Sequence, residues 1–205
     1  MNKMTPTLKA LTLAAVVLIL AGCNTLSKDA KSSSMIVIES ITGKNIGGED
    51  VAYLDSDVIG STGLIQADDA TANLMARLIN PSSGDGPSQF NDVVLTNYRI
   101  TYELPAGGGT AGVDVPLPFD GNFSTVTCPI DEAVSVPFVV VLEAAKLAAP
   151  LVNLVGTTTV LETRAKIEIF GHDLTDHAVS ATGYLTIRFA DYEDAVGAAV
   201  KTVKK

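Results

Sequence analysis

Alternation between polar and apolar residues is the clearest pattern along this chain, and it is strongest in residues 93–104 (VVLTNYRITYEL). That segment is rich in β-branched and aromatic residues, which favour strands. Its polar face consists of Asn97, Arg99, Thr101 and Glu103. Its opposite face consists of Val94, Thr96, Tyr98, Ile100 and Tyr102. A repeat of two residues predicts a half-buried β-strand.

Two further segments with the same repeat predict a hairpin near the C-terminal end. In residues 157–170 (TTTVLETRAKIEIF), one face consists of Ala165, Ile167 and Ile169. The other face consists of Arg164, Lys166 and Glu168. Residues 179–189 return with apolar residues at every second position, and residues 171–178 (GHDLTDHA) connect the two strands. The pattern therefore predicts two antiparallel strands joined by a polar turn.

Shorter apolar segments predict the remaining strands. The clearest are residues 35–41, 123–127 and 134–142. Residues 51–59 predict a strand that Asp55 and Asp57 interrupt. Residues 70–79 suit a helix by composition, but their place before the turn residues Asn80-Pro81 favours a strand.

Glycine and proline mark the connections between these segments. Residues 80–88 (NPSSGDGPS) predict a loop. After the glycines at 107–109, we expect a hairpin that returns through residues 113–119, where two prolines favour an edge or an irregular crossover. Residues 143–154 (EAAKLAAPLVNL) have the spacing of a short helical segment, interrupted at Pro150.

Seven to nine short strands separated by turn residues predict an all-β fold, an antiparallel sandwich or barrel. No helices alternate with the strands at the length of a βαβ unit, which argues against a parallel sheet.

The N-terminal segment has the pattern of a signal peptide. Lys3 and Lys9 provide positive charge, and residues 11–20 (LTLAAVVLIL) are apolar apart from Thr12. This stretch is shorter than the roughly 20 residues that a membrane span needs, but it suits the apolar region of a signal peptide.

The end of that segment, Leu20-Ala21-Gly22-Cys23, resembles the lipobox of bacterial lipoproteins. The resemblance implies a diacylglyceryl thioether on Cys23, cleavage before it and acylation of the new amino terminus, for example with palmitate. Several acyl chains would anchor the protein to a membrane. Asn24 in place of Asp implies the outer membrane, by resemblance to enterobacterial sorting. The alternative is an ordinary secretory signal.

The strand pattern also resembles immunoglobulin-like and fibronectin type III-like domains of bacterial surface lipoproteins. The similar segments are LTNYRITYEL (95–104) and TRAKIEIF (163–170). This resemblance implies an immunoglobulin-like β-sandwich of about seven to nine strands. The chain has no tryptophan and no cysteine pair, so a true immunoglobulin domain is not expected.

These features divide the chain into four predicted parts. They are a signal peptide (1–22), a lipidated tether (23–34), a β-sandwich domain (35–192) and a helical or disordered tail (193–205). Without Lys3 and Lys9, the mature chain carries 12 basic against 23 acidic residues. This acidic balance argues against nucleic acid and against adhesion to anionic lipid headgroups. With Cys23 lipidated, Cys128 has no disulfide partner, and we expect it to be buried.

Both histidines lie in one short segment and could bind a metal ion. His172, Asp173, Asp176 and His177 offer nitrogen and oxygen ligands for Zn²⁺ or another divalent ion. The alternative is a hairpin turn in which the aspartates bind the local backbone and the histidines face solvent.

A calcium site is a second candidate. Asp55-x-Asp57 begins like a calcium-binding loop, but Ile59 and Gln66 stand where that motif needs ligands. A looser Ca²⁺ site from separate acidic loops stays open, against the alternative of ordinary solvated loops.

No cofactor motif or catalytic motif is present. The chain lacks the G-x-S-x-G motif, and Gly107–Gly109 lack the lysine of a phosphate-binding loop. The sequence therefore predicts a non-enzymatic envelope lipoprotein that is structural or binds an envelope protein partner. A metal-binding or small-ligand-binding lipoprotein is the alternative, and an envelope hydrolase is the least favoured hypothesis.

Overall fold

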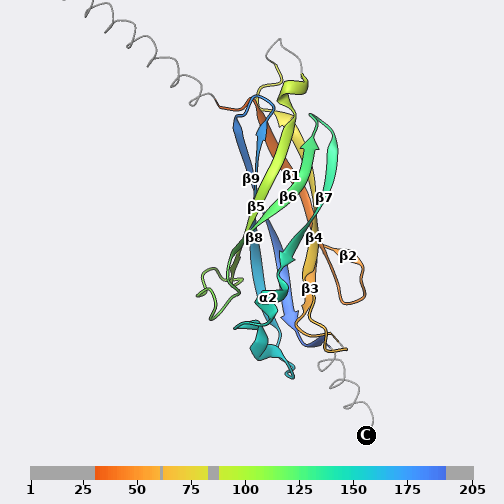
Figure 1. Ribbon diagram of the computed structural model, residues 1–205, viewed down its shortest axis with the longest axis vertical. Helices are drawn as coiled ribbons and strands as arrows, with labels where there is room; N and C mark the ends of the chain where they lie inside the picture. Colours follow the sequence, from red (N-terminus) through yellow and green to blue (C-terminus); the bar gives the residue numbers. More distant parts are fainter. Residues whose placement is uncertain (1–30, 61, 83–87, 193–205) are drawn as a thin grey trace, which may run out of the picture. The chain divides into compact units, whose positions relative to one another are not determined.

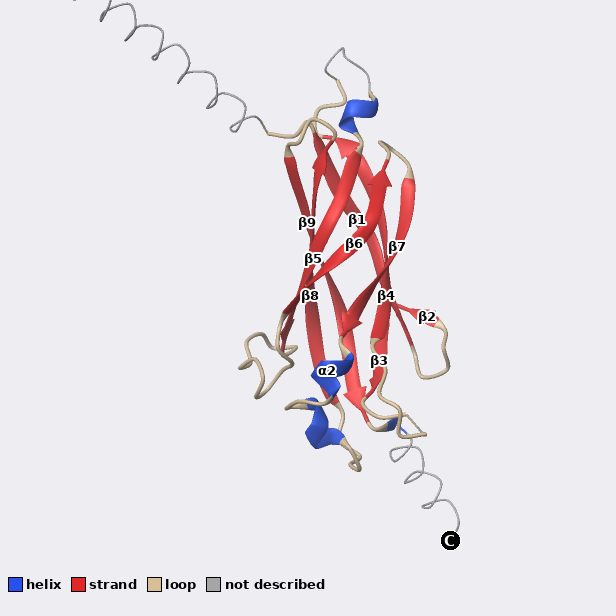
Figure 2. Ribbon diagram, in the orientation of Figure 1, coloured by secondary structure: helices blue, strands red, loops and turns tan. Residues whose placement is uncertain are grey.

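Two β-sheets make up most of the chain that the structure describes (Figures 1 and 2). The computed structural model describes residues 31–60, 62–82 and 88–192. The first sheet has the order β2-β1-β4-β7, and the second has the order β3-β9-β8-β5-β6. The predicted signal peptide, Cys23 and the predicted tail (193–205) lie outside the described residues.

The bounds of the first sheet are β1 Ser34–Lys44, β2 Asp50–Val51, β4 Asp68–Leu78 and β7 Ala133–Val141. Those of the second sheet are β3 Tyr53–Asp57, β5 Val93–Glu103, β6 Phe119–Cys128, β8 Leu161–Asp173 and β9 Ala178–Ala190. The strands β1, β4 and β7 take the places of strands A, B and E of an immunoglobulin-like sandwich, and β5, β8 and β9 those of C, F and G. The predicted all-β sandwich is therefore confirmed.

One strand pair departs from the antiparallel prediction. The strand β3 pairs with β9 in parallel, with Tyr53 opposite Thr186 and Asp57 opposite Ala190. The chain crosses from the first sheet to the second between β2 and β3, and β3 lies beside β9, which runs in the same direction. The prediction that Asp55 and Asp57 interrupt this strand was wrong, because both lie within β3.

A β-bulge changes which residues of β5 face the core. The register of β5 shifts between Leu95 and Asn97 against both of its neighbours. Val93 and Leu95 are buried before the bulge, and Tyr98, Ile100 and Tyr102 are buried after it. The predicted apolar face was therefore wrong at Val94 and Thr96, because the extra residue of a bulge reverses the alternation.

The connection after β5 is longer than predicted. The strand that returns beside β5 is β6, which begins at Phe119, so residues 104–118 form a loop and residues 113–119 are not the hairpin strand. The predicted helical segment is confirmed as the short helix α2 (Glu143–Lys146) and the 3₁₀ helix η3 (Leu151–Leu154), separated by a cis Ala149–Pro150 bond. Another 3₁₀ turn, η2 (Gln89–Asn91), precedes β5.

The core lies between the sheets and contains the inward residues of every long strand. Ile100, Ile167, Ile169 and Ile187 are fully buried in the second sheet, and Leu74 is fully buried in the first. Tyr98 packs edge-on against Phe138, which links the two sheets. Cys128 is also fully buried, as predicted, and burial raises the pKa of its thiol to about 11. The thiolate, which is the reactive form, is therefore scarce at neutral pH.

Candidate functional site

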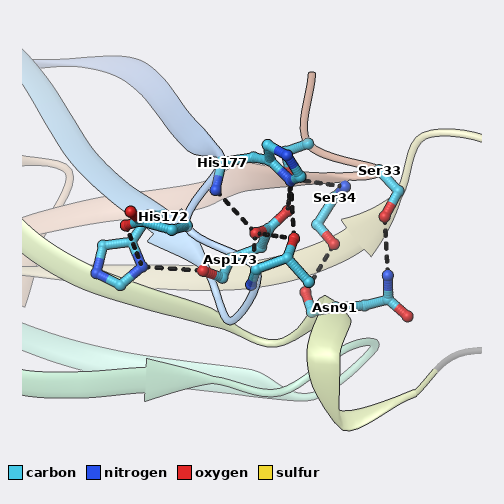
Figure 3. Close-up of polar contacts among 9 residues, drawn as sticks. Ser33, Ser34, Asn91, His172, Asp173 and His177 are labelled. Atoms are coloured by element: carbon cyan, nitrogen blue, oxygen red, sulfur yellow. Dashed lines mark hydrogen bonds and ion pairs between the residues drawn. The ribbon is translucent and has the colours of Figure 1, made fainter. Parts of the chain in front are cut away.

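Asp173, one of the predicted metal ligands, is the centre of a hydrogen-bond cluster where the chain enters the domain (Figure 3). It lies at the end of β8 and is 1% exposed. Ser32 Oγ donates to Asp173 Oδ2 at 2.7 Å. Thr175 donates to Oδ1 through its hydroxyl at 2.6 Å and its backbone N–H at 2.9 Å. The backbone N–H of His177 donates to the same oxygen at 3.0 Å.

These bonds keep the buried carboxyl ionised. Burial alone would raise the pKa of Asp173, but the hydrogen bonds from Thr175, Ser32 and His177 outweigh it and hold that pKa well below its usual value. A carboxylate that accepts several hydrogen bonds in its charged form behaves in this way. The ionised group therefore contributes to the stability of the turn and of the N-terminal entry.

Three consecutive serines, Ser32 to Ser34, form hydrogen bonds that attach the start of the described fold to this end of the sandwich. Ser32 Oγ also accepts the backbone N–H of Ser34 at 3.0 Å. Ser34 Oγ donates to the backbone oxygen of Asn91 at 2.6 Å, and Asn91 Nδ2 donates to Ser33 Oγ at 2.8 Å (Figure 3). The described fold thus begins at Ser32, inside the segment predicted as a tether (23–34).

Both histidines use Nδ1 for local contacts. His172 Nδ1 lies 2.9 Å from the backbone oxygen of Asp173, and a carbonyl only accepts, so this Nδ1 carries a proton. His177 Nδ1 lies 2.7 Å from Thr175 Oγ1. Since that hydroxyl already donates to Asp173, His177 Nδ1 is the donor in the contact. Both rings are therefore oriented by the turn.

The four predicted ligands do not converge on one point. His172 Nδ1 lies 4.0 Å from Asp176, whose side chain is 97% exposed, whereas Asp173 points into the domain towards Ser32. Within residues 31–60, 62–82 and 88–192, no group of three or more His, Cys, Asp or Glu side chains could hold a metal ion. The geometry matches the alternative interpretation for Asp173, a hairpin turn whose aspartate binds the local backbone.

Asp55, one of the two predicted calcium ligands, forms an ion pair with β9. Arg188 Nε and Nη2 lie 2.8 and 2.7 Å from Asp55 Oδ1. The Tyr192 hydroxyl lies 2.9 Å from the same oxygen, and the backbone N–H of Ile46 donates to Oδ2 at 3.2 Å. The Arg188 guanidinium also stacks over the Tyr53 ring at 4.1 Å. This carboxylate therefore joins β3 to β9 rather than standing free for a cation.

Asp57, the other predicted calcium ligand, lies beside a buried lysine that the sequence did not indicate. Lys146 is 2% exposed, and its Nζ donates to the backbone oxygen of Asp57 at 2.7 Å. The same Nζ lies 2.9 Å from Asp68 Oδ2. Burial raises the pKa of Asp68, and this effect outweighs the lowering by Lys146 and by the hydrogen bond from Ser56.

A cavity of about 280 Å³ adjoins this ion pair. It is lined by Asp57, Gly60, Thr62, Leu64, Gln66, Asp68 and Lys146. The sequence signal for it was a single lysine in the largely apolar segment 143–154 (EAAKLAAPLVNL), and this pattern does not identify the distant partner Asp68.

Cys23, the predicted lipidation site, lies outside the described residues. Within the part that is described, no helix has the length and hydropathy to cross a membrane.

Comparisons with known proteins add no assignment to this geometry: no protein-family model, no curated protein and no solved structure matches the chain.

Proposed function

We propose that this protein is a lipid-anchored lipoprotein of the bacterial cell envelope, held in the outer membrane, and that its sandwich is a non-enzymatic structural or protein-interaction module. The observation that carries the proposal is the sequence Leu20-Ala21-Gly22-Cys23, which begins at the last residue of the apolar segment 11–20. A thiol in that position is suited to alkylation by a lipid donor, because sulfur is the most nucleophilic side-chain atom available.

The position of the chain entry supports this proposal. Because Ser32 is bound by the buried carboxylate of Asp173, only residues 24–31 separate the domain from Cys23. A tether of this length would have a mean span of about 15 Å. The lipid would therefore hold the β8–β9 turn close to the membrane, and the opposite end of the sandwich, with α2 and η3, would face away from it.

The contacts of the polar side chains support a non-enzymatic role. Asp173 and Asp55 are engaged in ion pairs or hydrogen bonds that join segments of the fold. Cys128 is buried, and burial raises its pKa. These groups stabilise the domain, so the exposed loops and strand edges are the surfaces that would meet an envelope partner.

Mass spectrometry of the protein purified from its native membrane tests the proposal. We expect a mature amino terminus at Cys23 that carries acyl mass, and we expect the Cys23→Ser variant to lose both the acyl mass and membrane attachment. The matched control is Cys128→Ala, which should keep both. An unmodified chain cleaved at another residue would contradict the proposal and indicate a soluble secreted protein.

A further inference from the structure

The polar cavity beside Lys146 contains a carboxyl oxygen that the fold leaves without a donor. In Asp68, Ser56 Oγ donates to Oδ2 at 2.6 Å, and Lys146 Nζ lies 2.9 Å from the same oxygen. Among the described residues, no group donates to the other oxygen, Oδ1. Thr163 Oγ1 is the single buried side-chain polar atom of that part of the chain without a hydrogen bond. Asp68 Oδ1 is therefore not enclosed by the fold but open to the cavity that Asp68 lines.

Lys146 provides a hydrogen-bond donor at the same place. An ammonium group has three N–H donors. The backbone oxygen of Asp57 accepts one of them at 2.7 Å, and Asp68 Oδ2 accepts a second. Lys146 lines the cavity although its side chain is only 2% exposed. The fold thus holds an acceptor, Asp68 Oδ1, and the third N–H of Lys146 at the wall of one cavity.

The charges of this wall favour a neutral ligand that carries hydroxyl groups. A cation would meet the ammonium group of Lys146, which lies 2.9 Å from the Asp68 carboxyl group. An anion would meet two carboxyl groups, because both Asp57 and Asp68 line the cavity. A hydroxyl group both donates and accepts, so a single hydroxyl can donate to Asp68 and accept from Lys146. A neutral hydroxyl therefore fits this pair better than an ion of either sign.

The connection between β3 and β4 supplies further polar groups to the same cavity. Thr62 and Gln66 line it, and both are exposed residues. A hydroxyl and an amide can each donate and accept, so they can bond to additional hydroxyl groups of a ligand. The cavity volume of about 280 Å³ corresponds to about nine water molecules at roughly 30 Å³ each. That volume suits a single sugar or a polyol of similar size.

We propose that this cavity binds a small neutral polyol, such as a single sugar, with one hydroxyl group bonded to Asp68 Oδ1 and Lys146 Nζ. The other hollow beside α2 offers no such contacts. It is an apolar groove of about 250 Å³ between residues 117–119 and 142–149, and no charged side chain lines it. The proposal does not depend on the lipid anchor, because it concerns only the end of the sandwich with α2.

Backbone amide NMR of the full mature chain, titrated with glycerol and with D-glucose, tests this proposal. We expect saturable shifts of the amide signals of Gly60, Gly63 and Lys146. The first two amides donate to Leu64 and Gly60 within the loop, so they respond to a ligand that contacts it. The amide signal of Thr175, at the opposite end of the sandwich, should not change. Ethylammonium and acetate are the charged probes, and we expect each to bind at least about tenfold more weakly than D-glucose.

Two substitutions separate binding in the cavity from general binding to the surface. Gln66→Leu removes one polar group from the cavity wall at an exposed position, and we expect D-glucose to bind about fivefold more weakly. Gln89→Leu is the matched control: it makes the same change at an exposed position of η2 and should leave binding unchanged. Asp68→Asn removes the charged acceptor and should weaken binding by about tenfold or more.

Three results would overturn the proposal. The first is the absence of amide shifts at the cavity with both glycerol and D-glucose. The second is tighter binding of ethylammonium or acetate than of D-glucose, because one charge of the Lys146–Asp68 pair would then govern the site. The third is equal weakening by Gln66→Leu and Gln89→Leu, which would assign the binding to the general surface.

Discussion

Thr163 is a buried residue of β8 whose hydroxyl has no partner. It is fully buried, and its Oγ1 is the single buried side-chain polar atom without a hydrogen bond among the described residues. An unsatisfied buried hydroxyl costs about 1–3 kcal/mol. We therefore expect Thr163→Val, which keeps the side-chain shape, to raise the free energy of unfolding by about 1 kcal/mol. The midpoint of urea denaturation measures the change.

Thr175→Val is the control for that substitution, because the Thr175 hydroxyl donates to Asp173 at 2.6 Å. Its removal leaves a buried carboxylate short of a donor, so this variant should unfold at a lower urea concentration. A decrease for Thr163→Val as well would contradict the interpretation that its hydroxyl is unsatisfied.

At the scale of single residues, the sequence indicated which polar side chains could form a site, but it did not indicate their distant contacts. Asp173 was visible as a polar residue in a turn between strands, and its bonds to Thr175 and His177 follow from local turn chemistry. Its bond to Ser32 joins residues 141 positions apart, and no local pattern carries that information. The same holds for Asp55, whose partner Arg188 lies on a strand that is distant in sequence.

At the scale of elements, the sequence predicted most strands because alternation is a local property. The hairpin of β8 and β9 follows directly from period-two spacing. Strand pairing decides which residues of β5 face the core after its bulge. It also decides that β3 belongs to the second sheet. Neither is a local property of the sequence. The composition of residues 70–79 suited either a helix or a strand. These residues belong to the strand β4, because β1 and β7 provide hydrogen-bond partners for their backbone.

The ion pair that joins α2 to β4 allows a test at this scale. Lys146 is 2% exposed and Asp68 20% exposed, so removal of one partner leaves a poorly solvated charge. We expect Lys146→Met to lower the free energy of unfolding by about 3 kcal/mol. The double variant Lys146→Met/Asp68→Asn should lose at least about 1 kcal/mol less than the sum of the two single variants. Chemical denaturation of all four chains measures this coupling.

Lys44→Met is the comparison for the buried pair. Lys44 and Asp50 form an exposed ion pair at 3.0 Å, and exposed pairs contribute under about 1 kcal/mol. Strict additivity of the Lys146 and Asp68 substitutions would show that the two side chains do not stabilise each other.

At the scale of the whole molecule, the two ends of the sandwich differ in their chemistry. The entry end is fastened by hydrogen bonds around one ionised carboxylate, Asp173. The opposite end combines the buried Lys146–Asp68 pair with an apolar groove. The stability of the domain should therefore depend on pH through two carboxyl groups whose pKa values are shifted in opposite directions.

The sign of each contribution follows from linkage between protonation and folding. The pKa of Asp173 is lowered in the folded protein, so below about pH 4 the unfolded chain binds its proton first and stability is lost as pH falls. The pKa of Asp68 is raised, so the folded protein binds that proton first and gains stability relative to the unfolded chain as pH falls towards 4. Asp68 therefore partly offsets the effect of Asp173.

Thermal unfolding of Asp173→Asn across this pH range separates the two groups. At pH 7 we expect the variant to be less stable than the unsubstituted chain by about 2 kcal/mol, because an amide cannot replace a carboxylate that accepts several hydrogen bonds. As pH falls below about 4, the difference should shrink, because the unsubstituted chain then loses the contribution that the variant never had.

Asp176→Asn is the matched control: its side chain is 97% exposed, and its melting curve should follow that of the unsubstituted chain at every pH. Parallel curves for Asp173→Asn and the unsubstituted chain would mean that Asp173 is not the group that links acid to unfolding, and that the entry end is held by its neutral hydrogen bonds alone.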